Sequence, residues 1–118
     1  MPEAHGPPPL LHRSADFRGV RSPLLHDGVA LSGLLLSAAG AAGLGATESP
    51  IVRALPRGGL AAVLLLDVGH LAVHTLPGRE LLVLDVLVAR DRDPQQAVDV
   101  FVRKLGVSES RGTRQERG

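Results

Sequence analysis

The stretch that decides the fold is GLAAVLLLDVGHLAVHTLPGRELLVLDVLVA, from Gly59 to Ala89. It contains three short aliphatic runs: 59–68, 70–76 and 80–89. Pro77 and Gly78 separate the second run from the third. Short aliphatic runs bounded by Pro or Gly are typical of strands joined by tight turns. The stretch therefore predicts an antiparallel meander.

A helix is expected before the meander, over 22–46, because this segment is rich in Leu and Ala. It begins at Ser22 and Pro23 or is capped later, by Asp27. Residues 28–46 carry no charge and approach the length of a membrane span. Five glycines and two serines dilute this segment, so a buried or interface helix is favoured over a span. An uncharged helix would still expose an apolar surface for a membrane or a partner.

A second helix is expected after the meander, over 93–107, with Asp93 as its cap and Gly106 at its end. With further strands over 10–19 and 48–55, the element order is β-α-β-β-β-β-α. This order predicts an α+β two-layer sandwich, a mainly antiparallel sheet with two helices on one face. The expected organisation is a flexible Pro-rich tail, a single domain and a disordered polar tail: 1–9, 10–107 and 108–118.

The composition excludes several classes of function. The chain has 118 residues, which is enough for one domain, and no cysteine, so disulfides, thiolate metal sites and thiol catalysis are absent. Phe17 and Phe101 are its only aromatic residues and the net charge is +1, so nucleic-acid binding is not expected. The N-terminus lacks a basic region followed by an apolar run, which makes the cytoplasm the expected location.

His70 and His74 are the first candidates for a functional site. Histidines four residues apart can chelate one metal ion on a helix, but the sequence between them favours a strand. On a strand they would lie roughly 13 Å apart, too far for one zinc ion without other ligands. No Glu follows His70, so the metalloprotease pattern is also absent. No metal site is expected, and a structural role for these histidines is favoured over an active one.

The segment VGHLAVHTLPG, residues 68–78, resembles the processing region of the prokaryotic S-adenosylmethionine decarboxylase family, which typically reads E-S-H-I-S-I-H-T-W-P-E. The matching residues are His70, His74, Thr75 and Pro77. The likeness extends over about residues 10–105, and Asp85 lies at the family's distance from the Pro. It implies the α+β fold predicted above, an oligomer, and a relationship to polyamine (spermidine) biosynthesis.

The processing serine of that family is missing here. In the family, the serine hydroxyl attacks the preceding carbonyl, and the resulting ester eliminates to leave a pyruvoyl group. That group acts as the electron sink for decarboxylation. The equivalent position is Gly69, and Val68 replaces the Glu before it. Glycine has no side-chain oxygen, so neither the ester nor the pyruvoyl group is expected, and no other cofactor is predicted.

Other functional positions of the family differ as well. The catalytic Cys falls at Ala89, and the Ser eight residues before the processing Ser falls at Ala61. The substrate-binding Glu after the Pro falls at Gly78, and Glu80 could replace it only by a local shift. The adenine-stacking aromatic has no counterpart. His74 remains, but without the serine it is expected to be vestigial.

The resemblance therefore predicts a homologue that cannot cleave itself, and a non-catalytic ligand-binding or regulatory role. It would form a homo-oligomer, or a hetero-oligomer with an active paralogue, and S-adenosylmethionine or a polyamine are candidate ligands. One alternative is an active decarboxylase with an unrecognised mechanism; Ser49 and Thr75 are weak substitutes for the lost serine. Another is a membrane- or partner-docking protein that uses the apolar helix 28–46, although membrane contact is not favoured.

Overall fold

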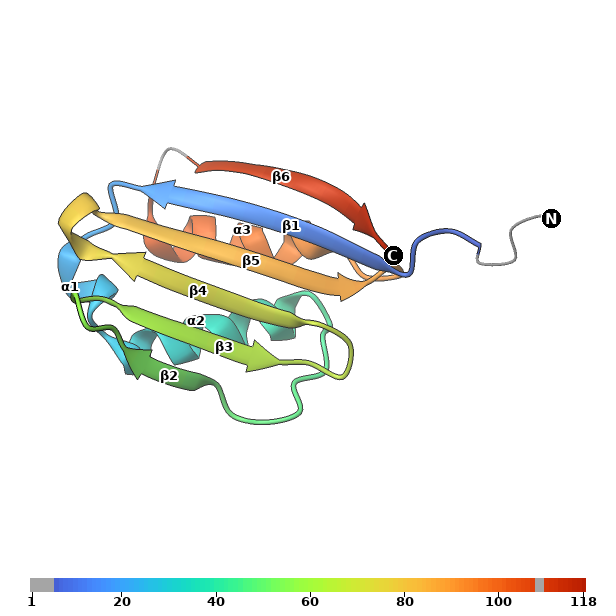
Figure 1. Ribbon diagram of the computed structural model, residues 1–118, viewed down its shortest axis with the longest axis horizontal. Helices are drawn as coiled ribbons and strands as arrows, with labels where there is room; N and C mark the ends of the chain where they lie inside the picture. Colours follow the sequence, from blue (N-terminus) through green and yellow to red (C-terminus); the bar gives the residue numbers. More distant parts are fainter. Residues whose placement is uncertain (1–5, 108–109) are drawn as a thin grey trace.

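The computed structural model describes residues 6–107 and 110–118. They form a six-stranded antiparallel sheet with helices packed on one face (Figure 1). The strand order is β2-β3-β4-β5-β1-β6. The strands are β1 Leu10–Arg18, β2 Ile51–Ala54, β3 Leu60–Leu65, β4 His70–Leu76, β5 Leu81–Ala89 and β6 Ser110–Arg117. This architecture confirms the predicted α+β two-layer sandwich, and β3, β4 and β5 form the predicted meander.

The helices are α1 Ser22–Leu25, α2 Gly28–Ala41, α3 Pro94–Leu105 and the short 3-10 helix η1 Pro77–Arg79. Of the two predicted starts of the helix over 22–46, the cap at Asp27 is confirmed for α2, whereas Ser22 and Pro23 begin the separate helix α1, and the chain breaks between the two helices. The predicted end at 46 is wrong, because α2 ends at Ala41. The break is caused by Asp27, whose side chain accepts a hydrogen bond from the backbone N–H of Ala30 and caps α2. The prediction for α3 is confirmed, since Asp93 caps its start and Gly106 follows its end.

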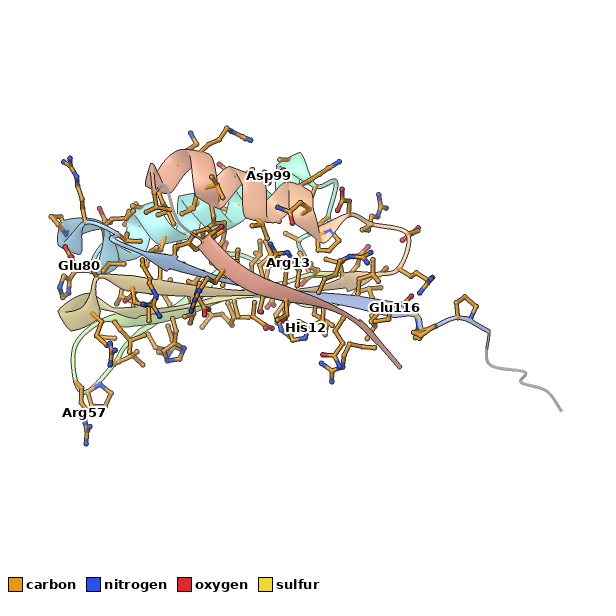
Figure 2. All side chains as sticks on the ribbon, turned by 90° about the horizontal axis from the view of Figure 1, so that it is seen from above. His12, Arg13, Arg57, Glu80, Asp99 and Glu116 are labelled. Atoms are coloured by element: carbon orange, nitrogen blue, oxygen red, sulfur yellow. The ribbon has the colours of Figure 1, made fainter. Side chains whose placement is uncertain are left out.

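The core lies between the sheet and helices α2 and α3. Alternate residues of β5 are buried beneath the helices: Leu82, Leu84, Val86 and Val88. The rings of Phe17 from β1 and Phe101 from α3 stack with centroids 6.0 Å apart. This alternation leaves the opposite face of the sheet, which we call the open face, uncovered by any helix in the described chain (Figure 2). The functional candidates lie on that face and at its two ends.

The C-terminal segment differs from its prediction as a disordered tail. Residues 110–117 form β6, which pairs with β1 in register from Leu10–Arg117 to Phe17–Ser110. Residues 1–5 of the other predicted tail, and 108–109, lie outside the described residues. The domain therefore includes the last strand and continues past residue 107.

The apolar segment 28–46 does not form a membrane span in this fold. None of the helices in the described part of the chain is long and apolar enough to cross a membrane. Helix α2 has 14 residues, and the chain after it passes through Gly43 at a positive φ of 68°. Its inner side packs into the core through five residues: Leu31, Leu34, Leu35, Ala38 and Ala39.

Candidate functional site

Gly69 lies in the tight connection between β3 and β4. The backbone N–H of Leu66 donates to the carbonyl of Gly69 at 3.1 Å, and Gly69 has a φ of +90°. L-residues rarely adopt this conformation. A Cβ at Gly69 would stand 1.9 Å from the carbonyl oxygen of Leu87 and 2.7 Å from its carbon. Position 69 therefore has no room for a side chain unless the hairpin and β5 move apart.

A small cavity of about 190 Å³ adjoins this connection. Its lining residues are Leu44, Asp67, Val68, Ala89, Asp91 and Arg92. The fold thus brings Ala89, the predicted counterpart of the family's Cys, close to Val68, the predicted counterpart of its Glu. None of these lining residues has a hydroxyl or a thiol, and the Asp67 carboxylate accepts the N–H of Val68 at 2.8 Å. The residues present do not fit a pyruvoyl group.

His74 lies near the opposite end of β4. It is exposed on the open face and is paired across the strands with Ala61 on β3 and Val83 on β5. His74 is therefore a direct neighbour of Ala61, the position that the resemblance aligns with a Ser of the family. His74 lies five positions after Gly69 along nearly extended chain, a distance of roughly 16 Å. Within one chain His74 is too far away to act at position 69.

A cluster of three polar residues lies at the centre of the open face. His12 on β1 hydrogen-bonds through Nε2 to Oδ1 of Asp85, and His70 Nε2 lies 3.2 Å from Asp85 Oδ2. Burial alone would raise the pKa of Asp85, but the hydrogen bonds and charges of the two histidines outweigh it, so this pKa is lowered. His12 was not identified from the sequence, because 73 residues separate it from Asp85.

This cluster, which we call the His12–Asp85–His70 cluster, has a structural explanation. It satisfies three polar side chains on a surface whose other central members, such as Ala72 and Leu87, are aliphatic. Within the described residues, no group of three or more His, Cys, Asp or Glu side chains is arranged to hold a metal ion.

Thr75, a match to the resembled family, is buried and joins three elements. Its Oγ1 donates to the carbonyl of Leu25 at 2.8 Å and accepts from the N–H of Leu60 at 2.8 Å. The hydroxyl is therefore occupied by backbone partners from α1 and β3. This geometry gives Thr75 a structural role and makes it unsuitable as a replacement nucleophile.

A larger cavity of about 510 Å³ lies at the end of the sheet where the β2–β3 and β4–β5 turns meet. Gly78, the position of the family's substrate-binding Glu, lines it together with His74. Glu80 does not line it; this residue ends η1 in the left-handed conformation with a φ of 49°, and its carbonyl accepts the N–H of Val20. The cavity therefore lacks the carboxylate that the resemblance would place there.

Comparison with known proteins finds the same family that the sequence resembles. The sequence profile described as S-adenosylmethionine decarboxylase matches residues 11–118. The solved structure of the adenosylmethionine decarboxylase from Aquifex aeolicus VF5 is similar, with a TM-score of 0.84 and 26% identity. That match covers 96% of this chain and 93% of the Aquifex chain. A search of curated proteins found no match. The profile match over nearly the whole chain shows that this protein belongs to the S-adenosylmethionine decarboxylase family.

Proposed function

We propose that this protein is a family member that neither cleaves itself nor decarboxylates, and that it acts as a ligand-binding or regulatory homologue. The observation that carries the proposal is the backbone at Gly69. Members of the family use a pyruvoyl group made from their own chain. At position 69 there is no hydroxyl to attack the carbonyl of Val68, and the Leu87 carbonyl occupies the space that a Cβ would need.

The surroundings of position 69 support the same proposal. Ala89 offers no proton donor where the family has a Cys, and Val68 offers no carboxylate where it has a Glu. His74 retains an imidazole but has no serine hydroxyl as its neighbour across the strands, since Ala61 is there. The side-chain groups that the resemblance would place at positions 61, 68 and 89 are therefore missing in addition to the serine hydroxyl at position 69.

A regulatory role requires a surface for a partner, and the open face supplies one. Family members are typically oligomeric. The open face and its ends expose large aliphatic side chains, among them Ile51, Leu65 and Leu76, each 39–42% exposed. Exposed aliphatic side chains on a sheet with no covering layer favour association with another apolar surface. We infer that a second copy, or an active paralogue, packs on this face.

Intact-mass spectrometry of the purified protein tests the loss of processing. The expected result is one uncut chain of 12.3 kDa. The Aquifex adenosylmethionine decarboxylase, purified in the same way, is the positive control for self-cleavage. Two fragments that divide before residue 69, with a keto-blocked new N-terminus, would contradict the proposal.

An activity assay separates loss of processing from loss of catalysis. The pure protein is incubated with S-adenosylmethionine labelled at its carboxyl carbon, and released carbon dioxide is trapped. We expect release no faster than in buffer, because the electron sink is absent. Release by an uncut chain would support a decarboxylase with another mechanism and would overturn the non-catalytic assignment.

A further inference from the structure

The cavity at the β2–β3 and β4–β5 turns has a charge that does not suit the family's substrate. Its walls are formed mainly by Leu55, Pro56, Leu76 and Pro77, and its charged side chains are Arg57 and Arg79. We call it the Arg57–Arg79 pocket. A volume of about 510 Å³ lies within the range of small-molecule sites.

The positive charge of this pocket is not neutralised by neighbouring acids. No Asp or Glu lines it, and in the described chain neither Arg57 nor Arg79 takes part in a salt bridge. A second cavity of about 450 Å³ shares Leu76 and Arg79 with it and adds Arg18. Figure 2 shows Arg57 projecting from its turn on the side of the sheet away from the helices. Three arginines, Arg18, Arg57 and Arg79, therefore line the two adjoining cavities at one end of the open face.

The remaining polar groups narrow the choice of ligand. The Thr75 hydroxyl already has two backbone partners, so it offers a ligand no free donor. The side-chain donors left are the guanidinium groups and the ring of His74, which is exposed. Arginine presents a planar set of N–H groups that matches a carboxylate or a phosphate with two parallel hydrogen bonds.

We propose that the Arg57–Arg79 pocket binds an organic anion, with a carboxylate or phosphate on the arginines and an apolar body on the Leu–Pro walls. This inference deepens the proposed ligand-binding role and rests on it. S-adenosylmethionine carries a net positive charge and polyamines carry several, so two unpaired arginines disfavour both. The absence of a carboxylate at Gly78 and the presence of Arg57 and Arg79 act in the same direction, away from a cationic ligand and towards an anionic one.

The test is a titration of the ¹⁵N-labelled full chain with two probes that share one ring system and differ in charge. Indole-3-acetate is the anion and tryptamine is the cation. Indole-3-acetate should give saturable amide shifts confined to 55–58 and 74–79, and tryptamine should give none. Phenyl phosphate, titrated in parallel, distinguishes a preference for phosphate from one for carboxylate. The double variant R57Q/R79Q should weaken anion binding at least tenfold.

The matched control is R103Q/K104Q, which also removes two positive charges, from two exposed residues in the last turn of α3. It should bind the anions within twofold of the parent chain. Equal binding of tryptamine or S-adenosylmethionine would overturn the inference. An equal loss of anion binding in R103Q/K104Q, or no saturation by either anion at millimolar concentration, would also overturn it. The anion titration does not depend on whether the chain is cleaved. A failure of the anion proposal can therefore be distinguished from a failure of the processing proposal.

Discussion

Single residues decide which side chains position 69 and the open face of this fold can accommodate. Gly69 is more than an absent hydroxyl, because its φ of +90° and the nearby Leu87 carbonyl exclude any side chain. Asp85 is kept on an aliphatic face because His12 and His70 both hydrogen-bond to it. At position 69 the backbone conformation determines which residue is tolerated. At position 85 the two histidine partners determine it.

Replacing Gly69 with Ser should therefore fail to restore cleavage and should destabilise the chain. The strained conformation alone costs about 1–3 kcal/mol, and the contact with Leu87 adds to it. We expect the Tm to fall by roughly 5 °C or more, with the intact mass unchanged. Gly78→Ala is the control, since a Cβ there meets nothing within 4 Å. A stable, self-cleaving Gly69→Ser variant would refute this account of the turn.

Asp85→Asn should lower stability in a pH-dependent way. The pKa of Asp85 is lowered in the folded chain, so its ionised form stabilises the fold above the unfolded value of 3.8. This contribution is lost as the pH falls from that value through the lower folded pKa. At pH 7 we expect a loss of a few tenths to about 1 kcal/mol, because the side chain is 42% exposed.

Urea unfolding of the parent and Asp85→Asn chains across pH 2 to 7 measures the effect. The two curves should converge at the acid end. Asp16→Asn is the control, because Asp16 is exposed on the same face and forms no salt bridge with another described residue. A gap between the parent and Asp85→Asn curves that persists below the folded pKa would show that the carboxylate charge is not its source.

At the scale of elements, the connections are held by side chains that reach across the layers. Thr75 on β4 ties α1 to β3 through one hydroxyl, and α2 begins where Asp27 caps it. The position of each element thus depends on one or two polar contacts in addition to the core.

Thr75→Val tests the contact between α1, β3 and β4. Valine preserves the shape but leaves the Leu25 carbonyl and the Leu60 N–H without their partner. We expect a loss of about 1–3 kcal/mol in the free energy of unfolding. Thr75→Ser retains the hydroxyl and should lose clearly less. Equal losses in both variants would assign the effect to packing of the methyl group rather than to the hydrogen bonds.

The sequence predicted the meander, α3 and the sheet-and-helix layers, because their apolar residues recur with strand or helix spacing. It missed β6, which is polar and exposed along its whole length and owes its place to pairing with β1. It left open whether the first helix begins at Ser22 or at the Asp27 cap, because leucines lie on both sides of Asp27, and it placed the end of that helix too late. At the candidate site, the assignment of Gly69, Ala89 and His74 to functional positions of the family stays a prediction from the resemblance, whereas the contact of His12 with Asp85 joins distant parts of the sequence and was not foreseen.

At the scale of the whole molecule, the two layers are covered unequally. The helices bury one face of the sheet, while Leu65 and Ile51 remain about 40% exposed on the other. On the helix side, Val29 of α2 is 86% exposed. These two surfaces are the alternatives for association with a partner.

Leu65→Lys should disrupt the oligomer and Val29→Lys should not. A lysine on the open face would have to be buried against an apolar partner, and an unpaired buried charge is costly. Size-exclusion chromatography with light scattering should show the parent and Val29→Lys chains as the same oligomer and Leu65→Lys as a smaller species. Dissociation by Val29→Lys alone would move the interface to α2, and a monomeric parent would remove the open face as a self-association surface.

The pairing of β1 with β6 has a practical consequence for anyone who immobilises this protein. Leu10 and Arg117 are register partners, so the start of β1 and the end of β6 lie at the same end of the sheet (Figure 1). The turn that holds Arg57 lies at the far end (Figure 1). A biotin or a surface tether at Gly118 would therefore hold the molecule with that turn facing the solution.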